Sequence, residues 1–136
     1  MKNLRFRKVK SAPVQAIVAL YRDAGWWKES RHARKIIPAM IRGSDCFLVA
    51  ETGKGEIVGM GRVLSDGASD GYIQDVVVRS DFQSKGVGKE IMSRLVRHCK
   101  ERGLEWIGVI SCSRTRNFYF RLGFRELENH AAMRHV

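Results

Sequence analysis

A β-branched run that leads into a glycine turn and then an amphipathic segment is the feature that most restricts the fold of this chain. Residues 72–78 are the most strongly β-branched run, which predicts a central strand covered on both faces. Beyond Gly86 and Gly88, residues 87–99 place apolar side chains on one side of a helix and charged ones on the other, and Gly103 ends it. This order predicts an α/β (α+β) chain.

Hydrophobic periodicity and turn residues predict further elements on both sides of this unit. We expect strands at residues 4–9, 46–51, 57–64, 106–110, 124–127 and 131–134, and helices at residues 14–25, 29–42 and 115–122. Ser11 and Pro13 predict a capped start for the first helix with proline in its first turn, and Pro38 should kink or split the second. The strands at 46–51 and 57–64 read as an antiparallel hairpin, in which Gly59 and Gly61 mark a bulge or a close backbone approach. With 136 residues and no linker, we expect one domain over residues 1–136.

The charge and the cysteines restrict the partners and the compartment. The formal charge of +11 must attract an anionic partner, but the basic residues are spread along the chain, which argues against a dedicated nucleic-acid surface. No apolar run is long enough for a membrane span, and the charged N-terminus does not read as a secretory signal. We therefore expect a cytoplasmic protein without a membrane partner.

The cysteines and histidines indicate neither a disulfide nor a metal site. Cys46, Cys99 and Cys112 form no CxxC pair and are expected to be buried free thiols. The four histidines show no metal-site spacing, so no metal is predicted.

The glycine turn has the chemistry of an anion site. A helix start exposes N–H groups without intrahelical partners, and Gly86 and Gly88 remove Cβ atoms that would keep a pyrophosphate off the backbone. Lys85 and Lys89 add positive charge. A Walker loop is excluded because Glu90 follows Lys89, and the dinucleotide fingerprint is excluded because Ile91 stands at its third glycine position.

Two motifs in order make the chain resemble the GCN5-related N-acetyltransferase (GNAT) superfamily. Its Gln/Arg-x-x-Gly-x-Gly/Ala signature is matched by Gln83, Gly86 and Gly88, and its Phe/Leu-Tyr-x-x-x-Gly-Phe by residues 118–124. The resemblance covers nearly the whole chain. It implies a mixed, mostly antiparallel sheet of six to seven strands with about four helices, which splays after Val78, and a homodimer through exchange of terminal strands.

The resemblance further implies that acetyl-coenzyme A is the cosubstrate. The residues expected to contact it are Val76, Val77 and Val78 through their backbone at the pantetheine arm, Gln83, Ser84, Lys85, Gly86, Val87, Gly88 and Lys89 at the pyrophosphate, and Asn117 at the far arm. Cys112 stands where many members carry an asparagine, seven residues before the tyrosine.

Acetyl transfer to an amine needs a neutral nucleophile and a proton for the departing thiolate. Tyr119 matches the family's usual acid; the alternative is an aromatic ring packed in the last helix with its hydroxyl on a backbone carbonyl. Strand alternation places Tyr72, Gln74, Val76 and Val78 on one face and Ile73, Asp75 and Val77 on the other. Gln74 cannot accept a proton and would orient water, whereas Asp75 is the base only if a bulge turns the strand there. Otherwise the Asp75 carboxylate is satisfied by backbone groups or an arginine.

The sequence restricts the acceptor amine less than it restricts the cosubstrate. Tyr72, on the face of Gln74, and Trp26 and Trp27 are expected to contact the substrate, although one tryptophan should belong to the core. The sequence favours transfer to a small-molecule amine in a ternary complex, because neither motif holds a cysteine as an acyl carrier. A protein or peptide amine acetyltransferase, and a non-catalytic binding module for an anionic partner, are the alternatives.

Overall fold

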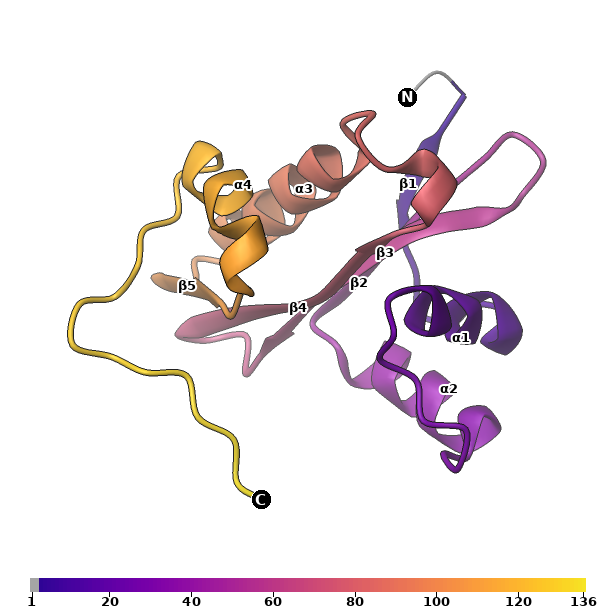
Figure 1. The fold of residues 1–136 in the computed structure, drawn as a ribbon, viewed down its shortest axis with the longest axis horizontal. Coiled ribbons are helices and arrows are strands. Elements are labelled where there is room, and N and C mark those ends of the chain that lie inside the picture. The colour runs from indigo at the N-terminus through magenta and orange to yellow at the C-terminus, as the bar shows by residue number, and fades with distance from the viewer. Residues whose placement is uncertain (1–2) are drawn as a thin grey trace.

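A five-stranded sheet forms the centre of the computed structural model, which describes residues 3–136 (Figure 1). Its strands follow one another in chain order as β1 (Arg5–Lys8), β2 (Cys46–Glu51), β3 (Ile57–Ser65), β4 (Asp70–Val78) and β5 (Trp106–Val109). The first four pair antiparallel, and β5 runs parallel to β4. The sheet is therefore mixed and mostly antiparallel, as predicted, but has five strands in the described residues.

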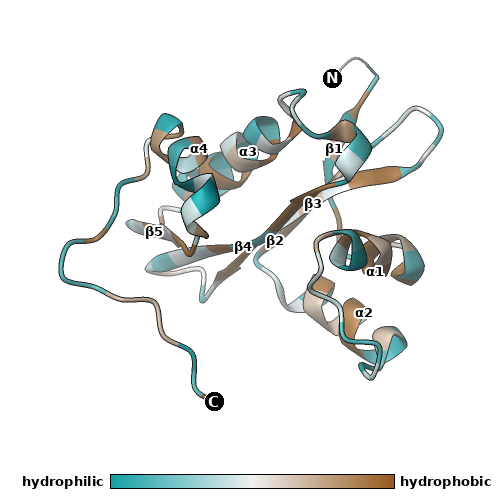
Figure 2. Cartoon of the chain, in the orientation of Figure 1, coloured by the Kyte–Doolittle hydropathy of each residue, from teal (hydrophilic) through white to brown (hydrophobic). Residues whose placement is uncertain are grey.

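Helices cover both faces of this sheet. One face carries α1 (Val14–Asp23) and α2 (Ala33–Gly43), and the other carries α3 (Val87–Glu101), with α4 (Arg116–Arg121) beside it (Figure 1). Figure 2 shows brown, apolar strands between helices whose outward turns are teal. Each helical layer thus buries one apolar side against the sheet. Within residues 3–136, no helix combines the length and apolarity that a membrane span requires.

Gly59 and Gly61 let α3 lie directly on β3. A Cβ atom at Gly59 would stand 2.9 Å from Cδ1 of Ile91, and one at Gly61 would stand 2.8 Å from Cδ1 of Leu95. Both distances are shorter than real Cβ contacts, so a larger residue at either position would have to displace the Ile91 or Leu95 side chain. The register between β3 and β4 also shifts between Met60 and Arg62. Both predicted reasons for the glycines, a close approach and a bulge, are confirmed.

The C-terminal prediction was wrong. Residues 124–127 and 131–134 form no strand, and the chain beyond Phe124 runs away from the sheet without regular structure (Figure 1). A strand exists only where another strand accepts its hydrogen bonds, and these residues have no such partner among residues 3–136.

Four smaller predictions also need correction. The second helix begins at Ala33 rather than near residue 29. It continues through Pro38, so of the two predicted effects of this proline the split is wrong and the kink stays a prediction. Pro13 is the N-cap residue of α1 rather than a member of its first turn, and no side chain caps this helix. Cys46 and Cys99 are buried free thiols as predicted, but Cys112 is exposed.

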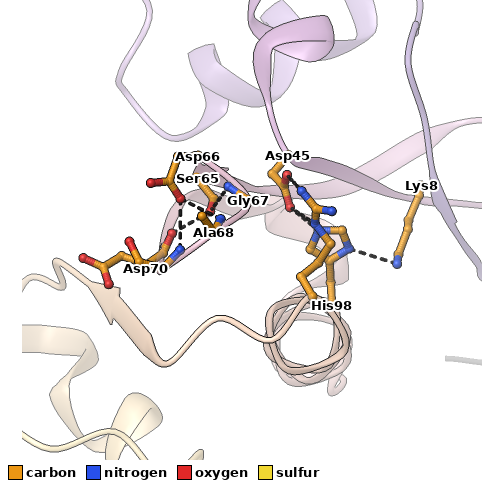
Figure 3. A network of polar contacts seen from close by, with 10 residues as sticks. Lys8, Asp45, Ser65, Asp66, Gly67, Ala68, Asp70 and His98 are labelled. Carbon is orange, nitrogen blue, oxygen red and sulfur yellow. Dashed lines mark hydrogen bonds and ion pairs between the residues drawn. The ribbon is translucent and has the colours of Figure 1, made fainter.

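A polar network joins the last turns of α3 to the end of β1 and to the residue before β2 (Figure 3). His98 Nε2 lies 2.7 Å from Asp45 Oδ2, and Lys8 Nζ lies 3.1 Å from His98 Nδ1. An ammonium group can only donate, so Nδ1 accepts and Nε2 carries the hydrogen that Asp45 accepts. Arg102 adds a second ion pair to Asp45, and its hydrogen bond is the main cause that lowers the pKa of Asp45. The network fixes the C-terminal half of α3 on the sheet.

Glu51 should contribute a pH-dependent part of the stability. Its carboxylate is largely buried and accepts hydrogen bonds from Arg7 and Arg5, which lower its pKa to about 2 from an ordinary value of 4.5. A lowered folded-state pKa stabilises the fold above pH 4.5, and this contribution disappears as the pH falls toward 2. Because both arginines are substantially exposed, we expect Glu51→Gln to lower the free energy of unfolding by only about 1 kcal/mol at neutral pH.

Urea unfolding of the Glu51→Gln variant at several pH values tests this expectation. The difference from the unchanged protein should shrink steadily below pH 4.5. Glu101→Gln is the matched control, because Glu101 is exposed and makes no ion pair within residues 3–136. A difference that does not depend on pH would show that Glu51 acts through packing alone.

Candidate active site

The loop before α3 leaves the start of this helix open. Gly86 is the N-cap residue with φ 85°, Ser84 also has a positive φ of 62°, and no side chain caps the helix. A Cβ atom at Gly86 would meet nothing within 4 Å, so no neighbouring group covers this side of the N-cap residue. Gln83 supports the loop by donating from Nε2 to the Val78 carbonyl over 2.9 Å. An uncapped helix start of this kind is suited to binding an anion.

Gly88 lies in a different environment. A Cβ atom there would make ordinary van der Waals contacts with Phe118 of α4 at 3.5 Å and with Val78 at 3.7 Å, so packing alone does not require glycine. Gly88 thus lies between β4 and α4 instead of facing the open space. Of the two lysines, Lys85 lies over the Phe82 ring at 5.5 Å and Lys89 is exposed on α3. Both remain available to an anion at the helix start.

The edge of β4 that faces β5 is unpaired over its second half. Pairing between the two strands ends at Ile73 and Val109, so the sheet opens there and not after Val78 as expected. No strand of residues 3–136 takes the backbone groups of residues 74–78 on this side. The backbone of Val76, Val77 and Val78 therefore borders the opening and leads directly into the loop before α3.

A bulge in β4 changes which side chains share a face. Asp75 has φ 57°, and the register with β3 shifts at this point. Ile73 and Val76, which were predicted on opposite faces, both pack with the α3 side of the core, whereas Val77 packs with the α1 and α2 side. The predicted alternation was wrong beyond Gln74, because the bulge residue turns the rest of the strand over. Asp75 consequently faces α1.

Two side chains from other elements hold the Asp75 carboxylate. Its Oδ2 atom accepts a hydrogen bond from the Tyr21 hydroxyl at 2.7 Å and another from Arg62 Nε at 2.9 Å. Arg62 and Asp75 expose 13% and 21% of their side chains, so the pair is shielded but reachable. Burial, followed by the hydrogen bond to Asp75, raises the pKa of Tyr21, which therefore stays a donor. Oδ1 of Asp75 has no hydrogen-bond partner within residues 3–136.

Tyr119 lies half-buried on α4, with edge-to-face contacts to Phe118 and Phe124. No group in residues 3–136 hydrogen-bonds its hydroxyl, so the alternative of a bond to a backbone carbonyl does not hold there. Burial first, and the neighbouring Cys112 second, raise the pKa of Tyr119 and keep its proton in place. Tyr119 and Tyr72 line the same cavity of about 650 Å³, which lies between β5, α4 and the C-terminal segment.

The remaining predicted site residues are the two tryptophans and Asn117. Trp27 packs on Tyr21 with ring centres 6.1 Å apart, whereas Trp26 is 50% exposed, so one tryptophan is at the core as expected. Asn117 is exposed on α4.

Sequence reasoning missed Arg62 and Tyr21. A lone arginine in an otherwise apolar strand was the one available signal for Arg62, and Tyr21 resembled any other apolar position of its helix.

An unpaired strand edge that leads to an uncapped helix start is the kind of site that receives an extended molecule with a phosphate group. The family model described as "Acetyltransferase (GNAT) family" matches residues 14–124. The chain belongs to this family, for which acetyl-coenzyme A is the general cosubstrate.

Relatives and solved structures agree with this membership. "GCN5-related N-acetyltransferase 2, chloroplastic" of Arabidopsis thaliana is 36% identical over 81 residues, which cover 55% of this chain but only 31% of that protein. "Uncharacterized N-acetyltransferase ycf52" of Porphyra purpurea is 26% identical, over 91% of this chain and 71% of that protein. A probable acetyltransferase from Staphylococcus aureus has the same fold, with a TM-score of 0.81, 20% identity and 98% of each chain covered. Because the Arabidopsis relative is chloroplastic, a cytoplasmic location stays a prediction.

Proposed function

We propose that this chain transfers an acetyl group from acetyl-coenzyme A to the amine of a small molecule, by direct attack in a ternary complex. The observation that carries the proposal is the continuity between the free edge of β4 and the open start of α3. Backbone groups of Val76, Val77 and Val78 would bind the amides of the coenzyme arm, and the N–H groups of residues 83–89 would bind its phosphates. Lys85, Lys89 and Asn117 would contribute at the rim.

The reacting amine would enter from the side of the bulge. An amine attacks as the neutral species, so a proton must leave it. The unpartnered Oδ1 atom of Asp75 accepts this proton, directly or through a water that Gln74 orients, while Tyr21 and Arg62 hold Oδ2. Attack breaks the carbon–sulfur bond of the thioester, and the Tyr119 hydroxyl gives its proton to the departing thiolate. In this proposal the base, Asp75, belongs to β4 and the acid, Tyr119, belongs to α4.

Binding and transfer assays test the proposal. Calorimetry should detect acetyl-coenzyme A binding with a dissociation constant on the order of tens of micromolar or below. An amine panel should then show acetylated product. An absence of binding would overturn the proposal, and an acetyl group trapped on the exposed Cys112 would replace the ternary complex with an acyl-enzyme.

Replacing Asp75 with asparagine separates the two candidates for proton removal. Asparagine adopts positive φ readily and has nearly the shape of aspartate, so the bulge should persist. We expect kcat/KM to fall by about 100-fold, because the amide cannot accept the proton. Gln74→Ala should cost about tenfold or less. A larger loss for Gln74→Ala than for Asp75→Asn would identify water held by Gln74 as the proton acceptor.

A further inference from the structure

Cations without ion-pair partners gather on the side of the sheet that Asp75 faces. The connection between α1 and α2 and the first turn of α2 carry four exposed cations, which we call the α2 cation patch: Lys28, Arg31, Arg34 and Lys35. Glu29 is the single acidic residue from 24 to 44, and it pairs with Arg22 instead. No acidic group in residues 3–136 pairs with the patch. Its charge is therefore uncompensated.

A continuous set of contacts links this patch to the bulge. The Arg31 guanidinium lies over the Trp27 ring at 5.3 Å, and Trp27 packs on Tyr21, whose hydroxyl binds Asp75. The exposed Trp26 ring stands next to Trp27 in the chain. Two intervening side chains, Trp27 and Tyr21, therefore connect Arg31 of the patch to the candidate base.

Arg62 places a further cation at the bulge itself. Only its Nε atom is used, in the bond to Asp75, and neither terminal nitrogen has a partner within residues 3–136. Every fully buried polar side-chain atom in those residues has a partner, so these two nitrogens reach solvent. The two terminal nitrogens of a guanidinium can bind a carboxylate or a phosphate through two parallel hydrogen bonds.

We infer that the acceptor carries a carboxylate or phosphate group besides its amine, and that Arg62 and the α2 cation patch bind this group while Asp75 faces the amine. The inference rests on the proposed acetyl transfer and names its substrate class. The same cations repel polyamines and lysine-rich peptides, whose net charge is strongly positive.

Matched amines measure this preference directly. We compare O-phosphoethanolamine with ethanolamine, and 4-aminobutyrate with butylamine, so that a phosphate and a carboxylate are tested separately. We expect kcat/KM to be about tenfold or more higher for the anionic member of at least one pair, with the ratio falling as salt is added. Equal values within both pairs, or better acetylation of a lysine-rich peptide, would overturn the inference and leave the acetyl transfer standing.

Paired variants locate the effect. Lys28→Gln/Arg31→Gln should reduce the preference for the anionic amine by about threefold or more, with little change for its neutral partner. The matched control is Arg97→Gln/Lys100→Gln, which removes one lysine and one arginine from the exposed side of α3 on the opposite face. Equal reductions in both double variants would show an effect of net charge alone and would overturn the role of the patch. Arg62→Lys keeps the charge but loses the planar fork and the Nε hydrogen bond to Asp75, so turnover should fall for both amines. The ratio of kcat/KM between the anionic and the neutral amine should fall as well.

A binding measurement makes the inference independent of turnover. With the protein saturated with coenzyme A, titrations of O-phosphoethanolamine and ethanolamine are followed by amide chemical shifts. Selective binding of the phosphate compound, with shifts around Arg31 and Arg62, supports the inference even if no amine is acetylated. Equal binding of O-phosphoethanolamine and ethanolamine would overturn the inference.

Discussion

Replacing Gly86 with valine should weaken acetyl-coenzyme A binding by about tenfold or more. Gly86 has φ 85°, a conformation that costs a residue with a Cβ atom about 1–2 kcal/mol and a β-branched residue more. Valine would pull the loop toward negative φ and turn the first N–H groups of α3 away from the phosphates. It would also place methyl groups in the space that is now open. Calorimetric titration with acetyl-coenzyme A measures the loss.

Gly103 supplies the control for this variant. It has φ 75°, lies just beyond the other end of α3 and, like Gly86, would place a Cβ atom in open space. Gly103→Val should therefore lower the melting temperature to a similar extent without changing coenzyme affinity. If both variants bind acetyl-coenzyme A equally well, the phosphates lie elsewhere.

Replacing Tyr119 with phenylalanine should lower kcat by about 100-fold and leave the affinity for acetyl-coenzyme A unchanged. The ring would keep its edge-to-face contacts with Phe118 and Phe124, so the variant removes only the hydroxyl. Because the departing thiolate needs a proton only in the transition state, the loss should appear in kcat. Steady-state kinetics and calorimetry on the same preparation separate these two quantities.

Tyr72→Phe provides the contrast, since Tyr72 lines the same cavity. Loss of its hydroxyl should change KM for the amine more than kcat. An unchanged kcat in the Tyr119→Phe variant would move the acid to another group. Equal losses of kcat in both variants would show that the cavity as a whole, rather than one hydroxyl, assists the reaction.

Local patterns were sufficient for the elements that position the coenzyme. The strand predicted at residues 46–51 is β2 with the same bounds, because a continuous apolar run between turn residues leaves few alternatives. The helix from Val87 to Glu101 and the strand before it were also predicted, since amphipathic spacing and β-branched residues are strong local signals. The two glycines of β3 indicated the close approach of α3 before its partners were known.

Local patterns misled where pairing decides the structure. Residues 124–127 have the composition of a strand, yet the described residues offer them no partner edge. The sequence raised the bulge at Asp75 only as one of two alternatives, because a register shift depends on the neighbouring strand and reverses every side chain that follows it. The faces assigned to Val76 and Val77 were wrong for this reason.

The sequence by itself determined the family's motifs, the open loop before α3 and the place of Tyr119, because each depends on residues that are neighbours in the chain. Only the tertiary structure decided the surroundings of Asp75. Tyr21 and Arg62 come from α1 and β3, 54 and 13 residues away in the sequence. Hydrogen bonds between such distant groups form only when the sheet and its helices pack together, so no local pattern records them.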